Sequence, residues 1–140
     1  MANLTNGYEA CDKSGALVGY NIKGSTRIFA GALVSIDDAT GYLVPAGDAA
    51  GRTFAGVAYE TGDNTTGTDG AIGIRVKKTG TYIYGFSGTA NQAVIGKKAY
   101  AVDDNAVALA ATTTSDVYVG DVVALVTGGK VRVRIDRAVG

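Results

Sequence analysis

The side chains that most often carry out chemistry in proteins are nearly missing from this sequence. Histidine is absent and Cys11 is the only cysteine, so Ser-His and Cys-His nucleophile pairs and histidine-containing zinc sites are excluded. Ser87 lies in Gly85-Phe86-Ser87-Gly88, which lacks the spacing of a nucleophile elbow. The Gly-Lys pairs at 96–97 and 129–130 lack the other residues of a phosphate-binding loop. We therefore expect no enzymatic activity and no cofactor.

Carboxylates are the remaining groups that could support hydrolysis or hold a metal ion. Asp37-Asp38 and Asp103-Asp104 are adjacent pairs, and neighbours on an extended chain point to opposite faces, so one pair cannot flank a bond. Aspartate favours turns, and we predict turns at both pairs; a shared acidic site is the alternative. The loop 61–70 offers oxygen ligands but lacks the closing glutamate of an EF-hand. Adventitious calcium is the alternative there, and we expect no dedicated metal site.

Basic side chains alternate with apolar ones in two segments. Arg75 and Lys77 occupy one of them, and Arg132 and Arg134 occupy the other. The simplest interpretation is a solvated strand face that also discourages edge-to-edge aggregation. The alternatives are docking on an acidic surface of a partner protein and binding of single-stranded nucleic acid. Nucleic acid is disfavoured because the formal net charge is zero and stacking aromatic residues do not alternate with these cations.

The composition predicts an all-β protein that would position these side chains on strands. The 21 glycines, with abundant Val, Thr and Tyr, are typical of short strands joined by tight turns, whereas only two Glu and one Gln argue against helices. Tyr82, Tyr84 and Phe86 would share one strand face as a core or subunit-interface stripe; a carbohydrate-stacking platform is the alternative. We expect a small barrel or sandwich of two similar three-to-four-stranded units.

The first 25 residues differ from the rest. Their apolar residues fit neither a helical nor a strand pattern, and we predict an extended N-terminal arm over 1–25 that orders against a partner. The alternative is a partly ordered terminus. The start of the chain has no basic region followed by an apolar stretch, which predicts no signal peptide, and no apolar run approaches the ~20 residues of a membrane span. The candidate partner-binding residues are Leu4, Tyr8, Leu17, Tyr20 and Ile22 of the arm, with Arg132 and Arg134.

Residues 26–140 are predicted to form a single β domain that contains an internal repeat, with units at about 26–86 and 94–137. The matching pieces are 31–38 with 96–104, 54–58 with 118–122, and 72–76 with 131–135. Each unit would be too small to bury its own apolar face, so two such units would pack into one core.

The order of these motifs resembles that of the small capsid decoration, or cement, proteins of tailed bacteriophage heads. The motifs are Gly-Ala-Leu-Val-Ser-Ile-Asp-Asp at 31–38, Phe-Ala-Gly-Val-Ala at 54–58, Ile-Arg-Val at 74–76, Gly-Thr-Tyr at 80–82, Val-Asp-Asp at 102–104 and Val-Arg-Val-Arg-Ile at 131–135. The similarity covers roughly residues 26–136. It implies a β-rich subunit that sits on the outside of the expanded shell and clamps neighbouring major capsid subunits, often as a homotrimer and sometimes as a dimer.

We therefore expect a structural virion protein that is made in the host cytoplasm, binds the outer surface of a bacteriophage head and stabilises the major capsid lattice. Its expected partners are the major capsid protein and further copies of itself, with no nucleic acid and no membrane. The alternatives are another virion structural module, such as a head fibre base or a tail component, and a carbohydrate-binding β module.

Overall fold

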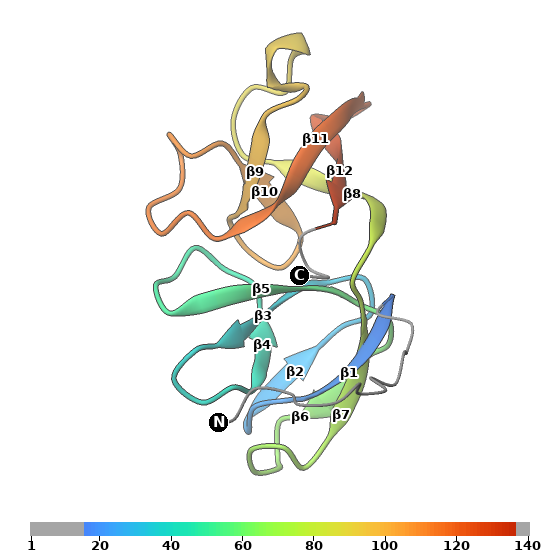
Figure 1. Ribbon diagram of the computed structural model, residues 1–140, viewed down its shortest axis with the longest axis vertical. Helices are drawn as coiled ribbons and strands as arrows, with labels where there is room; N and C mark the ends of the chain where they lie inside the picture. The colour runs from blue at the N-terminus through green and yellow to red at the C-terminus, as the bar shows by residue number, and fades with distance from the viewer. Residues whose placement is uncertain (1–15, 137–140) are drawn as a thin grey trace, which may run out of the picture.

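The computed structural model describes residues 16–136, which form an all-β protein of two lobes arranged along its long axis (Figure 1). Residues 16–78 make up the first lobe and residues 79–136 the second lobe. In the described part of the chain the only helix is a short 3-10 helix, η1 (Gln92–Val94). The predicted all-β class is confirmed, and each lobe has five main strands where three or four were expected.

The first lobe contains a five-stranded sheet and a two-stranded ribbon. Its strands are β1 (Leu17–Asn21), β2 (Thr26–Ile28), β3 (Leu33–Asp37), β4 (Leu43–Pro45), β5 (Arg52–Ala58), β6 (Gly62–Asn64) and β7 (Gly73–Lys77). The sheet has the order β1-β7-β5-β3-β4, and β2 pairs with β6 in the ribbon. A parallel bridge between Ile22 and Leu43 links the two outer strands, so the sheet is bent towards closure.

The second lobe is a closed five-stranded barrel. Its strands are β8 (Gly80–Phe86), β9 (Lys98–Ala101), β10 (Ala106–Ala108), β11 (Tyr118–Val126) and β12 (Lys130–Ile135). They follow one another as β10-β8-β12-β11-β9, and a parallel pairing of β10 with β8 closes the barrel. Alternating burial along β12, with Val131, Val133 and Ile135 fully buried, directs its basic residues to the outside.

The five main strands of each lobe repeat the same arrangement, and only the β2–β6 ribbon of the first lobe has no counterpart among the described residues. The order β8-β12-β11-β9-β10 in the second lobe corresponds to β1-β7-β5-β3-β4 in the first, with the same antiparallel neighbours. Hydrogen bonds between the strands match as well. The Gly31 N–H donates to the Ala58 carbonyl at 2.8 Å, and the Gly96 N–H donates to the Val122 carbonyl at 2.7 Å. The two lobes therefore share a backbone framework, although few of their side chains are identical.

A β-bulge with a following glycine occurs at the same place in both lobes. In the pairing of β5 with β3 the extra residue precedes Gly56, and in the pairing of β11 with β9 the extra residue precedes Gly120. A Cβ at Gly56 would overlap the carbonyl oxygen of Lys77, and a Cβ at Gly120 would overlap that of Arg134. Each glycine thus permits a close approach between backbones that no other residue would allow.

The lobe boundary differs from the expected domain division. Residues 17–21 form β1, which pairs with β7 along its whole length, so the arm expected over 1–25 is wrong for this part; residues 1–15 lie outside the described residues. β8 opens the second lobe, whereas the repeat expected over 26–86 assigned it to the first. In the third matching piece, the pairings align Ile74 with Val131, which shifts the expected correspondence by two residues.

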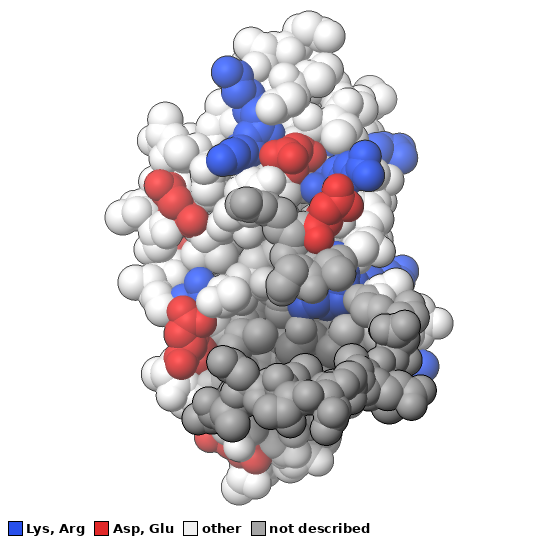
Figure 2. Space-filling model, in the orientation of Figure 1, with Lys and Arg blue, Asp and Glu red and all other residues white. Residues whose placement is uncertain are grey.

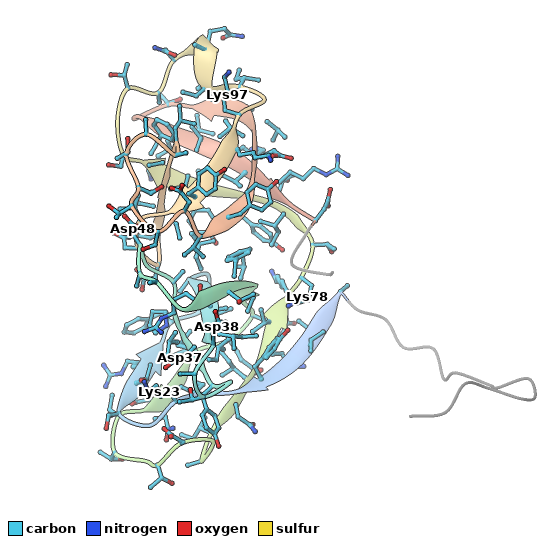
Figure 3. All side chains as sticks on the ribbon, turned by 60° about the vertical axis from the view of Figure 1, so that its left-hand side comes forward. Lys23, Asp37, Asp38, Asp48, Lys78 and Lys97 are labelled. Atoms are coloured by element: carbon cyan, nitrogen blue, oxygen red, sulfur yellow. The ribbon has the colours of Figure 1, made fainter. Side chains whose placement is uncertain are left out.

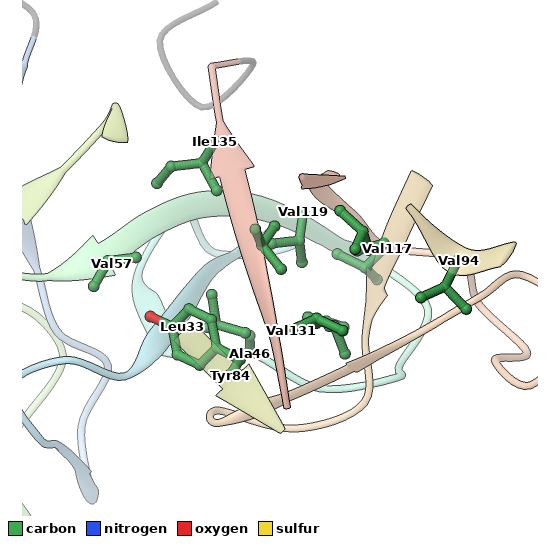
Figure 4. Close-up of a cluster of buried hydrophobic side chains, with 14 residues drawn as sticks. Leu33, Ala46, Val57, Tyr84, Val94, Val117, Val119, Val131 and Ile135 are labelled. Atoms are coloured by element: carbon green, nitrogen blue, oxygen red, sulfur yellow. The ribbon is translucent and has the colours of Figure 1, made fainter. Parts of the chain in front are cut away.

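The lobes are joined by a packed interface. Leu33, Ala46 and Val57 of the first lobe belong to the same buried cluster as Tyr84 and the barrel core (Figure 4). The Tyr84 hydroxyl donates to the Gly31 carbonyl at 2.8 Å, and the Leu33 N–H donates to the Asp104 carbonyl at 2.8 Å. These contacts hold the two lobes as one body, because separating them would expose the apolar cluster and break hydrogen bonds.

Candidate interaction surface

Two adjoining grooves cross the junction between the lobes. They have volumes of about 540 and about 430 Å³ and share Ala30, Gly31, Ile83 and Tyr84 in their walls. The segment 29–32 forms one wall because it turns sharply between β2 and β3. In this turn the Ala32 N–H donates to the Phe29 carbonyl at 3.1 Å, and Gly31 adopts a positive φ of 87°.

Large apolar side chains are exposed along these grooves. Phe29 is 56% exposed, and Tyr59 and Ile83 are each 46% exposed. They come from three separate parts of the chain: the turn before β3, the residue after β5, and the outer face of β8. A monomeric protein seldom groups exposed apolar side chains of this size without a binding role.

Two cations of the first lobe, Arg75 and Lys77, lie over aromatic rings. The Arg75 guanidinium is 4.9 Å and the Lys77 ammonium 5.4 Å from the centre of the Tyr59 ring, and Lys77 is also 5.7 Å from that of Tyr82. Glu60 accepts hydrogen bonds from Arg75 Nε at 2.9 Å and from Nη2 at 3.2 Å. These hydrogen bonds lower the pKa of the Glu60 carboxyl group, which stays ionised and fixes the guanidinium over the ring.

The ribbon repeats this construction at Phe29. The Arg27 guanidinium lies 5.8 Å from the centre of the Phe29 ring and donates to Asp63 at 2.9 Å. The Asp63 carboxylate also accepts from the hydroxyl and the N–H of Thr65, and these bonds, with that from Arg27, lower its pKa to about 2. Arg27 is therefore held in position by a carboxylate that remains charged.

The second lobe continues the surface on the outside of its barrel. Arg132 of β12 lies directly opposite Ile83 of β8, and Lys130 lies opposite Gly85. The Arg134 Nε is 3.0 Å from an oxygen of Asp136. We call the whole surface the basic-aromatic face and define it by the following residues: Arg27, Phe29, Tyr59, Arg75, Lys77, Ile83, Lys130 and Arg132. Figure 2 shows Lys and Arg side chains gathered beside β8 and β12 and again lower on the same side.

Three of the five cations on this face have no carboxylate partner within the described residues. Arg27 forms an ion pair with Asp63, and Arg75 forms one with Glu60. The other three cations have no carboxylate at ion-pair distance in the part of the chain that the structure describes: Lys77, Lys130 and Arg132. The face therefore presents positive charge that is available to an external partner, beside exposed apolar side chains.

The structure separates the residues that the sequence grouped as partner contacts. Leu17 is 38% exposed in β1, and Tyr20 is half-buried and accepts a hydrogen bond from Lys78 Nζ at 2.6 Å. Ile22 is fully buried at the bridge to β4, so its assignment as a partner contact is wrong for the folded chain. Arg132 and Arg134 are exposed, as a partner contact requires. Leu4 and Tyr8 lie outside the described residues.

Sequence reasoning missed the aromatic half of the basic-aromatic face. It assumed that aromatic residues do not alternate with the cations, and this is wrong at Lys77, which lies between Tyr59 of the first lobe and Tyr82 of the second lobe. The stripe of β8 behaves as the core prediction required: Tyr84 is buried, and Tyr82 and Phe86 pack against the barrel core. Tyr84 is only 6% exposed, which leaves its ring little surface on which a sugar could stack.

The paired aspartates serve turns, as predicted. Asp37 Oδ1 accepts from the Ala39 N–H at 3.2 Å, and Asp103 Oδ1 accepts from the Asn105 N–H at 2.9 Å. Asp37 is also bound by Lys23 at 3.0 Å and Arg52 at 3.2 Å (Lys23, Asp37 and Asp38 are labelled in Figure 3). Residues 16–136 contain no group of three or more Cys, Asp or Glu side chains arranged to hold a metal ion.

Within residues 16–136, no helix has the length and apolar character needed to cross a membrane. Comparisons of this chain with protein-family models, with curated proteins and with solved structures found no match.

Proposed function

We propose that this protein is a structural virion protein that binds the outer surface of a bacteriophage head and stabilises the major capsid lattice. The observation that carries the proposal is the basic-aromatic face, an exposed surface that spans two β lobes joined by a packed core. The order of motifs resembling capsid decoration proteins supplies the partner in this proposal.

Mass action explains how such a protein would act. A protein that binds only the assembled and expanded shell stabilises that state by an amount that grows with its concentration and affinity. The bound protein must resist deformation, because a flexible link between subunits would transmit little restraint. The shared core of Leu33, Val57 and Tyr84 gives the two lobes a fixed relative position. Several copies joined to one another would further raise the affinity through multivalent contact, and we propose that the protein forms a homo-oligomer, most simply a trimer.

Co-sedimentation with undecorated, expanded phage heads tests this function. We expect saturable binding at micromolar protein or below, with little binding to unexpanded heads, and a higher temperature of head disruption when the protein is bound. A protein that stays in the supernatant at every concentration up to tens of micromolar contradicts the proposal. Light scattering after size-exclusion chromatography tests the trimer separately, since a monomer at all concentrations would remove that part alone.

A further inference from the structure

We propose that the basic-aromatic face is the docking surface of the protein, and that its partner is a polypeptide surface on which acidic side chains lie beside apolar ones. This inference rests on the proposed function in one respect: it names the surface that would meet the capsid. Binding to such a partner can also be measured without any phage head, with a soluble polypeptide that carries acidic and apolar side chains.

The apolar part of the face argues for a polypeptide partner with apolar side chains. Phe29, Tyr59 and Ile83 are about half exposed and border two grooves large enough to receive side chains. Covering exposed apolar groups of this size would supply most of the binding energy, as aromatic anchors do in the centres of protein interfaces.

The charged part of the face argues that the partner is acidic. Lys77, Lys130 and Arg132 have no carboxylate at ion-pair distance among the described residues, and all three lie around Ile83 and the groove walls. Lys77 is already held between the Tyr59 and Tyr82 rings, at 5.4 and 5.7 Å from their centres. Ordering this side chain on binding would therefore cost less conformational entropy than ordering a free lysine.

The same geometry disfavours single-stranded nucleic acid. Nucleic-acid binders of this kind leave aromatic faces open so that bases can stack on them. Here the cations lie over the rings themselves, with Arg75 and Lys77 over Tyr59 and Arg27 over Phe29.

The first test uses a soluble probe, a random copolymer of glutamate and tyrosine, and measures its binding by fluorescence anisotropy at two salt concentrations. We expect Lys77→Glu with Arg132→Glu to weaken binding at least tenfold and Ile83→Ser to weaken it about fivefold. The control is Lys97→Glu with Lys98→Glu, a pair of exposed lysines at the start of β9, a strand that pairs with neither β8 nor β12. The control should bind within about twofold of the wild type. Thermal unfolding by circular dichroism confirms that every variant is folded.

The second test repeats the comparison with expanded phage heads. If the wild type binds heads and the double variant binds them equally well, the docking surface is wrong while the proposed function stands. If the wild type ignores heads but binds the copolymer through Lys77 and Arg132, the proposed function is wrong while the docking surface stands. Equal copolymer binding by the wild type and the double variant overturns the inference, as does binding of a thymidine oligonucleotide at physiological salt that exceeds binding of the copolymer.

Discussion

The two lobes share a backbone framework but differ at the surface through which they could stack. The cross-strand pair Leu33 and Val57 in the first lobe corresponds to Lys98 and Asp121 in the second. Leu33 and Val57 are buried against the other lobe, whereas Lys98 and Asp121 are exposed. An apolar pair at this position thus joins one lobe to the next, and a charged pair ends the stack after two, as polar capping repeats do in longer repeat proteins.

The lobes also differ in the connection that follows the strand with the bulge. In the second lobe, β11 leads to β12 through a tight turn at 127–129, whereas in the first lobe the connection 59–72 contains β6. This longer connection supplies Tyr59, Glu60 and Asp63 to the basic-aromatic face. The shared framework therefore provides the rigid body, and the differences between the lobes provide the candidate function.

The largest expected effect tests the shared framework. Gly56→Ala and Gly120→Ala each place a Cβ on a backbone carbonyl oxygen, that of Lys77 or Arg134, and Gly56 also has a φ of 142°. We expect each substitution to lower the free energy of unfolding by more than ~3 kcal/mol, or to prevent folding. Gly19→Ala is the control, because nothing lies within 4 Å of its Cβ, and it should change stability by less than ~1 kcal/mol. Urea denaturation measures all three. A large effect at only one of the two bulges would show that the lobes do not share this constraint.

The next effect tests the difference at the lobe ends. Leu33→Ala removes a fully buried side chain from the interface and should cost about 2–4 kcal/mol. Lys98→Ala, at the equivalent position, removes an exposed side chain and should change stability by less than ~0.5 kcal/mol. Chemical denaturation of both variants checks the contrast, and equal losses would contradict the proposed roles of the two positions.

Replacing the charged pair of the second lobe by the apolar pair of the first lobe should make the exposed end of the second lobe self-associate. Lys98→Leu with Asp121→Val places an apolar pair where the second lobe is exposed. We expect the double variant to self-associate at concentrations where the mass of the wild type does not change. Multi-angle light scattering measures the mass of both proteins. An unchanged mass up to millimolar concentration would show that the charged pair does not limit stacking.

A smaller effect concerns the hydrogen bond between the lobes. Tyr84→Phe leaves the ring in place but removes the donor to the Gly31 carbonyl. We expect a loss of about 1–2 kcal/mol, since a carbonyl at the interface would lose its partner. Burial also raises the pKa of the Tyr84 phenol, which keeps its proton for donation. Calorimetry of the variant measures the loss, and an unchanged melting temperature would mean that the bond adds nothing.

The smallest effect is a dependence on pH that is confined to the first lobe. Hydrogen bonding from Lys23, followed by that from the Ala39 N–H, lowers the pKa of Asp37, whereas Val102 occupies the corresponding place in the second lobe. A folded-state pKa below the unfolded value of about 3.9 stabilises the protein above that pH, and the benefit is lost as pH falls through the folded pKa. Asp37→Asn should therefore flatten the acid side of the stability profile. Parallel profiles for variant and wild type would contradict this.

The repeat could be recognised in the sequence where both lobes need a particular residue for their backbone conformation. It could not be aligned correctly where alternating strand residues fit more than one register. Gly31 and Gly96, and Gly56 and Gly120, can be matched because each pair meets the same backbone demand. The match of β7 with β12 slipped by two residues because a strand pattern with period two looks the same after such a shift. β1 was missed because Gly19 interrupts it and its partner β7 lies more than fifty residues away along the chain.

The sequence predicted the cations of the candidate site but not its exposed apolar residues, for a related reason. The alternation of cations along β7 and β12 can be read from neighbouring residues, and it predicted an exposed basic face. Phe29, Tyr59 and Ile83 come together only through the topology of two lobes, and each alone reads as an ordinary strand or turn residue. The opposite error occurred at Ile22, which was predicted to be a partner contact but is buried in the core beside its parallel bridge to Leu43.

The most direct measurement is a cryo-electron microscopy reconstruction of expanded phage heads incubated with the protein. We predict two-lobed density on the outside of the shell, with the side formed by β7, β8 and β12 turned towards acidic and apolar residues of the capsid surface. Heads that carry no added density at saturating protein would contradict the proposed function. Bound density that turns this side towards the solvent would contradict the assignment of the basic-aromatic face as the docking surface.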